Sequence, residues 1–222
     1  MKFGVPILAF GMLSSALLLG CGGSTGEAAT GGGTPGGPMT AAQALAMLNE
    51  GNARFVARPV SSPHPTRHER AETANHQAPF AIIVGCADSR TGPEIVFDQS
   101  IGDLFPVRVA GNLVDDYGLG SIEYAVEHLG TRLIVVMGHE RCGAVTAAMD
   151  ADDADGYVGS LVRAIRPAVL ATEGMEGDPL ENAVVENARR VAEEIRGKAH
   201  LTADTQVVTA YYDLDTGVVR FD

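Results

Sequence analysis

Clusters of basic residues are missing from this sequence. Its 222 residues contain 16 Lys and Arg against 28 Asp and Glu, a formal net charge of −12. Because nucleic acid phosphates are bound by grouped cations, a nucleic acid partner is excluded. Tryptophan is absent and there are only three cysteines. If Cys21 has a separate role, the chain can form at most one internal disulfide, between Cys86 and Cys142.

The N-terminal segment has a pattern of its own. After Lys2 comes an uncharged stretch, Phe3 to Gly20, that ends in Leu-Leu-Gly before Cys21. This ending resembles a bacterial lipoprotein signal, in which cleavage precedes an acylated cysteine. The alternative is a membrane-spanning anchor, since the stretch approaches the ~20 residues that a span needs. We expect residues 1–20 to be a signal peptide and Cys21 to carry the lipid, on the exported side of a bacterial membrane.

Glycine dominates the segment that follows. Residues 22–38 contain eight glycines in seventeen positions. Such a composition cannot bury apolar surface and is typical of a flexible tether. We expect residues 21–38 to be a lipidated tether and residues 39–222 to be one folded domain.

Hydrophobic periodicity predicts alternating helices and strands in this domain. We expect helices near residues 41–55, 69–76, 122–129, 157–170 and 181–196, after a break at residues 59–68. We expect strands near residues 80–85, 104–109, 133–137, 206–212 and 217–221. The alternation predicts an α/β fold, a mostly parallel central sheet flanked by helices. Pro106 removes a ladder donor, so its strand should lie at a sheet edge.

Three potential metal ligands follow two of the expected strands. Cys86 comes after the first strand, and His139 and Cys142 come after the third. Functional residues of parallel sheets collect beyond the carboxyl ends of the strands. If these strands are neighbours, the three side chains meet, and two cysteines with one histidine leave a fourth position open, as at catalytic zinc sites.

A disulfide between Cys86 and Cys142 remains the alternative in an exported protein. It would explain neither His139 nor the Asp-Ser-Arg that follows Cys86. Cys142 also precedes a Gly-Ala pair that indicates a helix start, where the helix dipole would favour its thiolate.

Four segments carry a family resemblance: CADSR at residue 86, PEIVFDQSIGDLFPVRVAGN at residue 93, SIEYAVEHLG at residue 121 and GHERCGA at residue 138. They are similar to successive signatures of β-class carbonic anhydrases. The resemblance implies one Zn²⁺ per chain on Cys86, His139 and Cys142, with Asp88 and Arg90 as the catalytic dyad. The implied reaction is reversible hydration of carbon dioxide to bicarbonate and a proton.

The resemblance also implies a substrate pocket and an assembly. Gln77 would donate a hydrogen bond to substrate, Phe105 and Tyr124 would wall the pocket from a neighbouring subunit, and Gly143 would lie beside the ligand Cys142. We therefore expect a homodimer, with a tetramer as the larger possibility, in which the N-terminal helices pack on the partner.

Two further expectations concern the state of the site and its substrate. Ile83 stands where the subgroup with a regulatory bicarbonate site has tryptophan, so we expect an open site at neutral pH, with Asp88 a metal ligand only if the site closes. The alternatives are a zinc hydrolase of carbon disulfide or carbonyl sulfide, a zinc- or bicarbonate-binding lipoprotein without turnover, and a disulfide-stapled solute-binding lipoprotein.

Overall fold

A central five-stranded sheet organises the domain. The computed structural model describes residues 39–57 and 65–222. The expectations for residues 1–38 and for residues 59–64 of the predicted break lie outside this part. The strands are β1 (Ala81–Gly85), β2 (Leu104–Arg108), β3 (Leu133–His139), β4 (Gln206–Tyr212) and β5 (Val219–Phe221). Their order is β2-β1-β3-β4-β5, and every pairing is parallel except the last. The predicted fold class is confirmed, and Pro106 lies in an edge strand.

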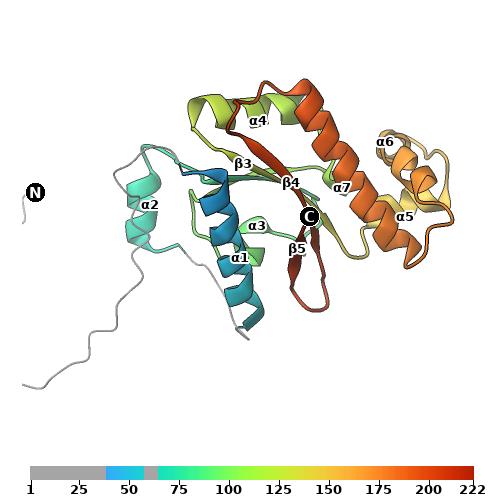
Figure 1. The fold of residues 1–222 in the computed structure, drawn as a ribbon, viewed down its shortest axis with the longest axis horizontal. Coiled ribbons are helices and arrows are strands. Elements are labelled where there is room, and N and C mark those ends of the chain that lie inside the picture. The colour runs from blue at the N-terminus through green and yellow to red at the C-terminus, as the bar shows by residue number, and fades with distance from the viewer. Residues whose placement is uncertain (1–38, 58–64) are drawn as a thin grey trace, which may run out of the picture. The chain divides into compact units, whose positions relative to one another are not determined.

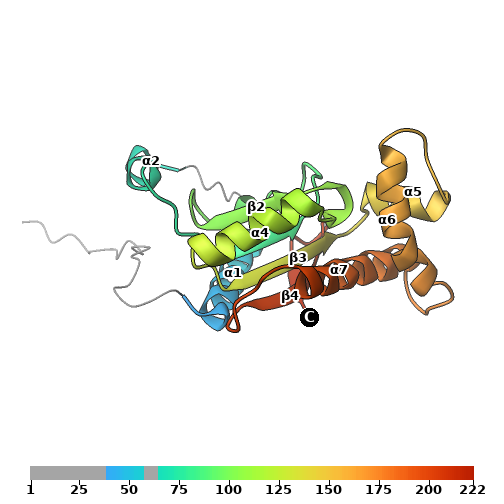
Figure 2. The same ribbon diagram turned by 90° about the horizontal axis from the view of Figure 1, so that it is seen from above.

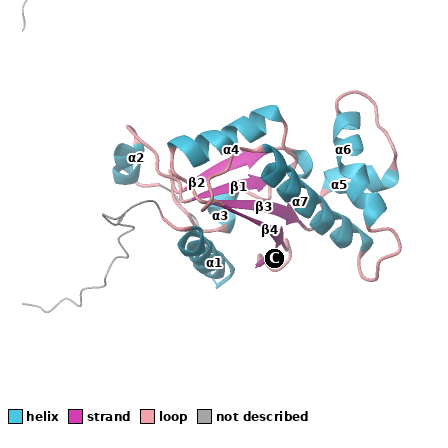
Figure 3. Ribbon diagram, turned by 45° about the horizontal axis from the view of Figure 1, so that its top comes forward, coloured by secondary structure: helices cyan, strands magenta, loops and turns pink. Residues whose placement is uncertain are grey.

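Helices cover both faces of the sheet (Figures 1 and 3). They are α1 (Ala41–Ala57), α2 (Arg67–Thr73), α3 (Pro93–Val96), α4 (Asp116–His128), α5 (Gly143–Asp150), α6 (Val158–Ala171) and α7 (Pro179–Lys198), with a 3₁₀ turn at Ala110–Asn112. Figure 2 shows α5 and α6 together beyond one end of the sheet. Within the described ranges, no helix is both long enough and apolar enough to cross a bilayer.

The two central strands are buried on both faces. Every residue of β1 and β3 is buried, which explains their continuous apolar runs. Side chains alternate between two cores: Ile83 and Val135 face α1 and α3, whereas Ile82 and Val136 face α4 and α7. Burying each such side chain contributes about 1.5–3 kcal/mol, so the centre of the sheet is a rigid base for residues at its ends.

Local signals set the helix starts. Thr40 and Gln43 form the predicted reciprocal hydrogen bonds ahead of α1. The predicted start of α2 near Glu69 was wrong: Thr66 caps this helix in a capping box with Glu69, so it begins at Arg67 and ends at Thr73. The reciprocal bonds satisfy two of the free amides at the helix start.

A buried asparagine ties α1 to the rest of the fold. Asn52 donates to the carbonyls of Val96 and Gly217 and accepts from the amide of Val219. Asn52→Leu would leave three backbone groups without partners, and we expect the free energy of unfolding to fall by roughly 3 kcal/mol or more in urea titration. The control is Asn49→Leu on the exposed side of the same helix, where one hydrogen bond is lost. Equal losses in the two variants would contradict this role.

Candidate metal centre

Cys86, His139 and Cys142 come together at the carboxyl ends of β1 and β3. Their ligand atoms all lie within 4.8 Å of one another, and all three residues are buried. The parallel pairing of β1 with β3 brings the two strand ends side by side. His139 is the last residue of β3, two residues beyond the predicted strand end, so the expectation that it comes after the strand was wrong. Cys142 is the N-cap of α5, as its predicted place at a helix start required.

The donor set fits a zinc ion. Nδ1 of His139 lies 2.9 Å from the carbonyl oxygen of Glu140, a contact that assigns the proton to Nδ1 and leaves a lone pair on Nε2. Nε2 is buried and has no hydrogen-bond partner among the described residues. Both cysteines are free thiols, so the disulfide alternative is not supported. Two sulfurs and one imidazole nitrogen are typical zinc ligands, and no fourth Cys, His, Asp or Glu joins this group within the described residues.

The two thiols share one hydrogen bond and titrate unequally. That bond, together with contacts from His139 and the amides of Asp88 and Gly111, lowers the pKa of Cys86 well below its usual value. The Cys86 thiolate and burial raise the pKa of Cys142. The backbone amides of Ala144 and Val145 at the start of α5 lower the pKa of Cys142, as its place at a helix start predicts. Their effect is smaller than that of burial and the Cys86 thiolate, because a second buried negative charge is costly. A metal ion would replace the shared proton and make both sulfurs thiolates.

Asp88 is held at the edge of this cluster by Arg90. The guanidinium Nε and Nη2 donate to the two carboxylate oxygens at 2.9 and 2.7 Å, and the Arg90 amide donates to Oδ1. These bonds hold the pKa of Asp88 well below its ordinary range. Its Oδ2 lies 3.9 Å from Nε2 of His139. An ionised carboxylate is therefore fixed beside the three donors.

Neighbouring elements fix the loop after β1. Arg108, at the end of β2, donates to the carbonyls of Cys86 and Asp88. The amide of Gly111 donates to Sγ of Cys86, and Asn187 of α7 binds the Gly111 carbonyl. Sequence reasoning missed these residues because their partners lie 20 to 76 positions away and no local pattern marks the contact.

The loop between His139 and Cys142 is clamped by the turn between β4 and β5. Arg141 has a left-handed backbone with φ of 51°, and its guanidinium binds both carboxylate oxygens of Asp215. The carboxylate of Glu140 accepts from the amides of Leu214 and Asp215. A left-handed conformation costs a non-glycine residue roughly 1–2 kcal/mol, so these contacts help to hold the ligand loop in place.

Asp215→Asn should therefore hold the loop between His139 and Cys142 less firmly, while all three metal ligands remain. Exposed ion pairs contribute little because solvent screens them, so we expect zinc to dissociate at most about fivefold faster. Zinc release to a chromophoric chelator measures this rate. The matched control is Asp204→Asn, which breaks an exposed pair with Arg132 before the amino end of β4. If both variants release zinc at the wild-type rate, the clamp does not position the ligands.

The residues expected to bind substrate lie in two places. Gly143 follows Cys142 at the start of α5. Gln77 and Tyr124 instead line a separate open cavity of about 500 Å³, and the rings of Phe105 and Tyr124 are 6.4 Å apart. Gln77 precedes β1 whereas Cys86 follows it, and at ~3.3 Å per residue the strand separates them by on the order of 15 Å. Within one chain Gln77 therefore does not reach the metal cluster, and none of the three candidate ligands lines the cavity of Gln77 and Tyr124.

Comparisons with known proteins agree with this geometry. A family model described as Carbonic anhydrase matches residues 81–219. Carbonic anhydrase 2 of Mycobacterium tuberculosis is 50% identical over 127 residues, 55% of this chain and 61% of the relative. The carbonic anhydrase of Mycolicibacterium smegmatis is 46% identical over 127 residues, 55% of this chain and 62% of the relative. The chain thus spans about three fifths of the length of these curated relatives.

Solved structures share the fold. A tetrameric β-carbonic anhydrase of Sordaria macrospora has a TM-score of 0.62 at 22% identity, covering 69% of this chain and 85% of that chain, a likeness of fold alone. The Coccomyxa β-carbonic anhydrase in complex with acetazolamide has a TM-score of 0.57 at 26% identity, covering 68% and 74%. The chain belongs to the carbonic anhydrase family, in its β class.

Proposed function

We propose that this chain is a zinc enzyme that catalyses the reversible hydration of carbon dioxide to bicarbonate and a proton. The observation that carries the proposal is the buried group of Cys86, His139 and Cys142 with the carboxylate of Asp88 fixed beside it. Three protein donors leave a position for water, which is how catalytic zinc sites differ from structural ones. When bound, zinc supplies a Lewis acid that lowers the pKa of water toward ~7, an effect for which three-histidine carbonic anhydrases are the standard example.

Asp88 and Arg90 would orient the attacking water. Because Arg90 keeps Asp88 ionised, the carboxylate can only accept hydrogen bonds. With Oδ1 and Oδ2 both bound by the guanidinium, a lone pair left on Oδ2 can accept a hydrogen bond from a water molecule beside His139. This hydrogen bond orients the water so that a lone pair of its oxygen points toward carbon dioxide. Holding the two reactants in this geometry lowers the entropic part of the barrier.

The test is stopped-flow hydration of carbon dioxide by the purified zinc-loaded protein, with zinc content measured on the same sample. We expect rapid turnover with about one zinc per chain. Parallel assays with carbonyl sulfide and carbon disulfide distinguish the related hydrolases. Zinc without carbon dioxide turnover, or a preference for a sulfur substrate, would overturn the proposal.

We further propose that two chains complete each other's sites in a homodimer, with a tetramer as the larger assembly. The support is the position of Gln77 and Tyr124, which line a cavity away from the metal cluster of their own chain. Tyr124 is 46% exposed, and Ile95 and Ile101 are similarly exposed. In a two-fold dimer the same surface on both chains meets, so these residues can approach the partner's metal site.

Mixed dimers test this arrangement. Cys142→Ser removes a metal ligand, and Gln77→Ala removes the substrate donor. Refolded together in equal amounts, the two chains should regain activity at roughly a quarter of the sites, because one site of each mixed dimer is intact in a two-fold assembly. Each variant refolded alone is the control. If the mixture is no more active than the sum of the two controls, Gln77 does not act across the dimer.

We also propose that Cys21 carries a lipid that anchors the domain to the exported side of a bacterial membrane. The support is the uncharged stretch of residues 3–20 that ends directly before Cys21, followed by the Gly-rich tether. Labelling of cells with a palmitate analogue should mark the wild type and not Cys21→Ser. Equal labelling, or recovery of unlabelled wild type from the cytoplasm, would contradict the anchor.

A further inference from the structure

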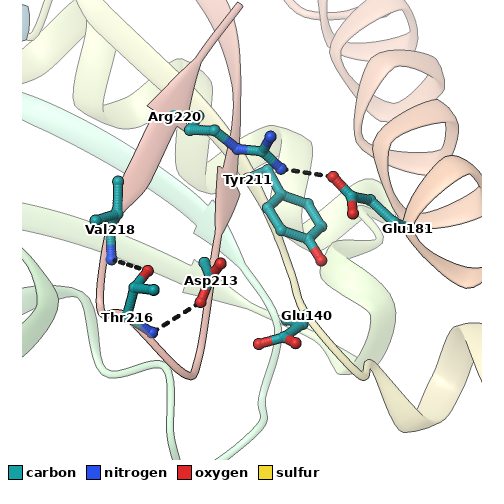
Figure 4. A pocket seen from close by; sticks show the side chains of 7 residues that line it. All are labelled: Glu140, Glu181, Tyr211, Asp213, Thr216, Val218 and Arg220. Atoms are coloured by element: carbon teal, nitrogen blue, oxygen red, sulfur yellow. Dashed lines mark hydrogen bonds and ion pairs between the residues drawn. The ribbon is translucent and has the colours of Figure 1, made fainter. Parts of the chain in front are cut away.

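One buried side chain outside the metal ligands lacks a hydrogen-bond partner. Among the described residues, only Nε2 of His139 and Nδ2 of Asn112 are buried side-chain atoms without one. Even in the open cavity beside the β4–β5 turn, Figure 4 shows Arg220 paired with Glu181. His139 is a candidate metal ligand, so Asn112 is the buried side chain that the proposed function leaves unexplained.

Asn112 also has an unusual backbone conformation. Its φ is 47°, in the left-handed region that residues other than glycine adopt at a cost. The amides of Asn112 and Ala87 both donate to the carbonyl oxygen of Val109, at 2.9 and 3.3 Å. The 3₁₀ turn that ends at Asn112 therefore lies against the loop that follows Cys86. Strained residues and unpaired buried groups are concentrated at functional sites.

The same turn supplies Cys86 with a hydrogen-bond donor from outside its own loop. Sγ of Cys86 accepts from the amide of Asp88, two residues along the chain, at 3.4 Å, and from the amide of Gly111 at 3.3 Å. Gly111 has φ of 70°, and a Cβ atom on it would lie 2.6 Å from Cδ1 of Ile165 and 3.3 Å from Cβ of Ala144. Helices α5 and α6 thus pack directly against the turn that carries this amide.

Asn187 holds the turn from a third helix, α7. The residue is 2% exposed, and the other buried residues of α7 are all apolar. Its Nδ2 donates to the carbonyl oxygen of Gly111 at 2.8 Å. A buried amide group is unfavourable unless it is hydrogen-bonded, so packing alone does not explain an asparagine here. The contacts run from α7 through Gly111 to the sulfur of Cys86.

We propose that Asn187 and Asn112 are positioning residues that hold the Gly111 amide on the sulfur of Cys86. Asn187 fixes the carbonyl of Gly111, and the left-handed backbone of Asn112 sets the direction of the turn. A hydrogen bond to a ligand sulfur withdraws electron density from it. Two thiolates neutralise much of the charge of zinc, so a sulfur that donates less leaves a bound zinc ion a stronger Lewis acid. The inference rests on the proposed zinc site and not on turnover.

Cobalt(II) loaded in place of zinc makes the metal–sulfur bond visible, because a cobalt–thiolate site absorbs light by sulfur-to-metal charge transfer. In the full chain, Asn187→Leu should move this band to longer wavelength, since a sulfur without its hydrogen bond gives up an electron more readily. Zinc affinity, measured by competition with a chromophoric chelator, should fall by about 10- to 100-fold, the range typical of residues that support metal ligands.

Two substitutions at Asn112 test the turn without altering Asn187. Valine is strongly disfavoured in the left-handed region, so Asn112→Val should shift the cobalt band as Asn187→Leu does. Glycine adopts this conformation freely, so Asn112→Gly should keep the wild-type band. The matched control for Asn187→Leu is Asn52→Leu. It also removes a buried amide that binds backbone carbonyls, but these carbonyls belong to Val96 and Gly217, which are not in the turn or the ligand loops.

The outcomes separate this inference from the proposed function. A wild-type cobalt band in folded Asn187→Leu or Asn112→Val would overturn the inference. An equal shift in Asn52→Leu would also overturn it, because the band would then report a general loss of stability. Absence of a sulfur-to-metal band in the wild-type protein would overturn the zinc site itself, and with it the proposed function.

Discussion

Cys142→Ser should abolish carbon dioxide hydration and lower the zinc content. Cys86 and His139 would remain as two donors, fewer than the three that hold catalytic zinc. A bound metal contributes several kcal/mol to transition-state stabilisation, so we expect kcat/KM to fall by more than about a thousandfold. Stopped-flow assays and metal analysis on the same preparation measure both effects.

The fold should survive this substitution. Cys142 is the N-cap of α5 and makes no capping hydrogen bond with its side chain, and serine is among the preferred N-cap residues. The matched control is Cys21→Ser, which replaces the third cysteine of the chain and should keep zinc and turnover. A Cys142→Ser enzyme with wild-type zinc content and activity would show that the metal site lies elsewhere.

Arg90→Ala should lower turnover while zinc stays bound. Arg90 does not belong to the cluster of donors, but it binds both carboxylate oxygens of Asp88. Without it, Asp88 is free to turn toward Nε2 of His139, 3.9 Å away, and to occupy the fourth position at the metal. Loss of one preorganised hydrogen-bonding group costs roughly 10²- to 10³-fold in kcat, and we expect a loss in that range.

Two variants separate this effect from general destabilisation. Arg90→Lys keeps the charge but not the bidentate geometry, so it should restore only part of the activity. Arg163→Ala on α6 breaks an exposed pair with Asp153 and should leave turnover unchanged. An Arg90→Ala enzyme that is fully active would contradict the role of the pair, and one that loses its zinc would contradict the proposed closure.

The low pKa of Asp88 determines how the Asp88–Arg90 pair responds to acid. A carboxylate whose pKa is lowered by folding contributes stability above its unfolded pKa, and this contribution is lost as the pH falls through the folded value. Arg90 lowers the pKa of Asp88, so Asp88 stays ionised at neutral and mildly acidic pH. Mild acid should therefore not open the pair by protonating Asp88, and any loss of turnover there would arise from other groups.

Local patterns were sufficient to predict the sheet and the three metal-ligand candidates. The apolar runs of β1 and β3 indicated buried parallel strands, and Pro106 indicated an edge. Because β1 and β3 are parallel neighbours, their carboxyl ends lie side by side. Cys86 and His139 stand at these ends and therefore come together. The short helix α3 and the 3₁₀ turn after β2 were missed because elements of three or four residues carry no periodic signal.

The contacts that support the ligands could not be predicted in this way. Arg141 and Asp215 are 74 residues apart, and their pairing depends on how the β4–β5 turn packs against the ligand loop. The unequal titration of Cys86 and Cys142 likewise follows from burial and a shared hydrogen bond, which spacing does not reveal. Sequence identified the candidate ligands, and packing determines how they are held.

Zinc K-edge X-ray absorption of the purified zinc-loaded protein tests the central claim most directly. The account predicts two sulfur neighbours at about 2.3 Å and two lighter nitrogen or oxygen neighbours at about 2.0 Å, in a four-coordinate site. Cys142→Ser should remove one of the sulfur neighbours. A site with no sulfur, or with more than two, would contradict the assignment of Cys86, His139 and Cys142 as the zinc ligands.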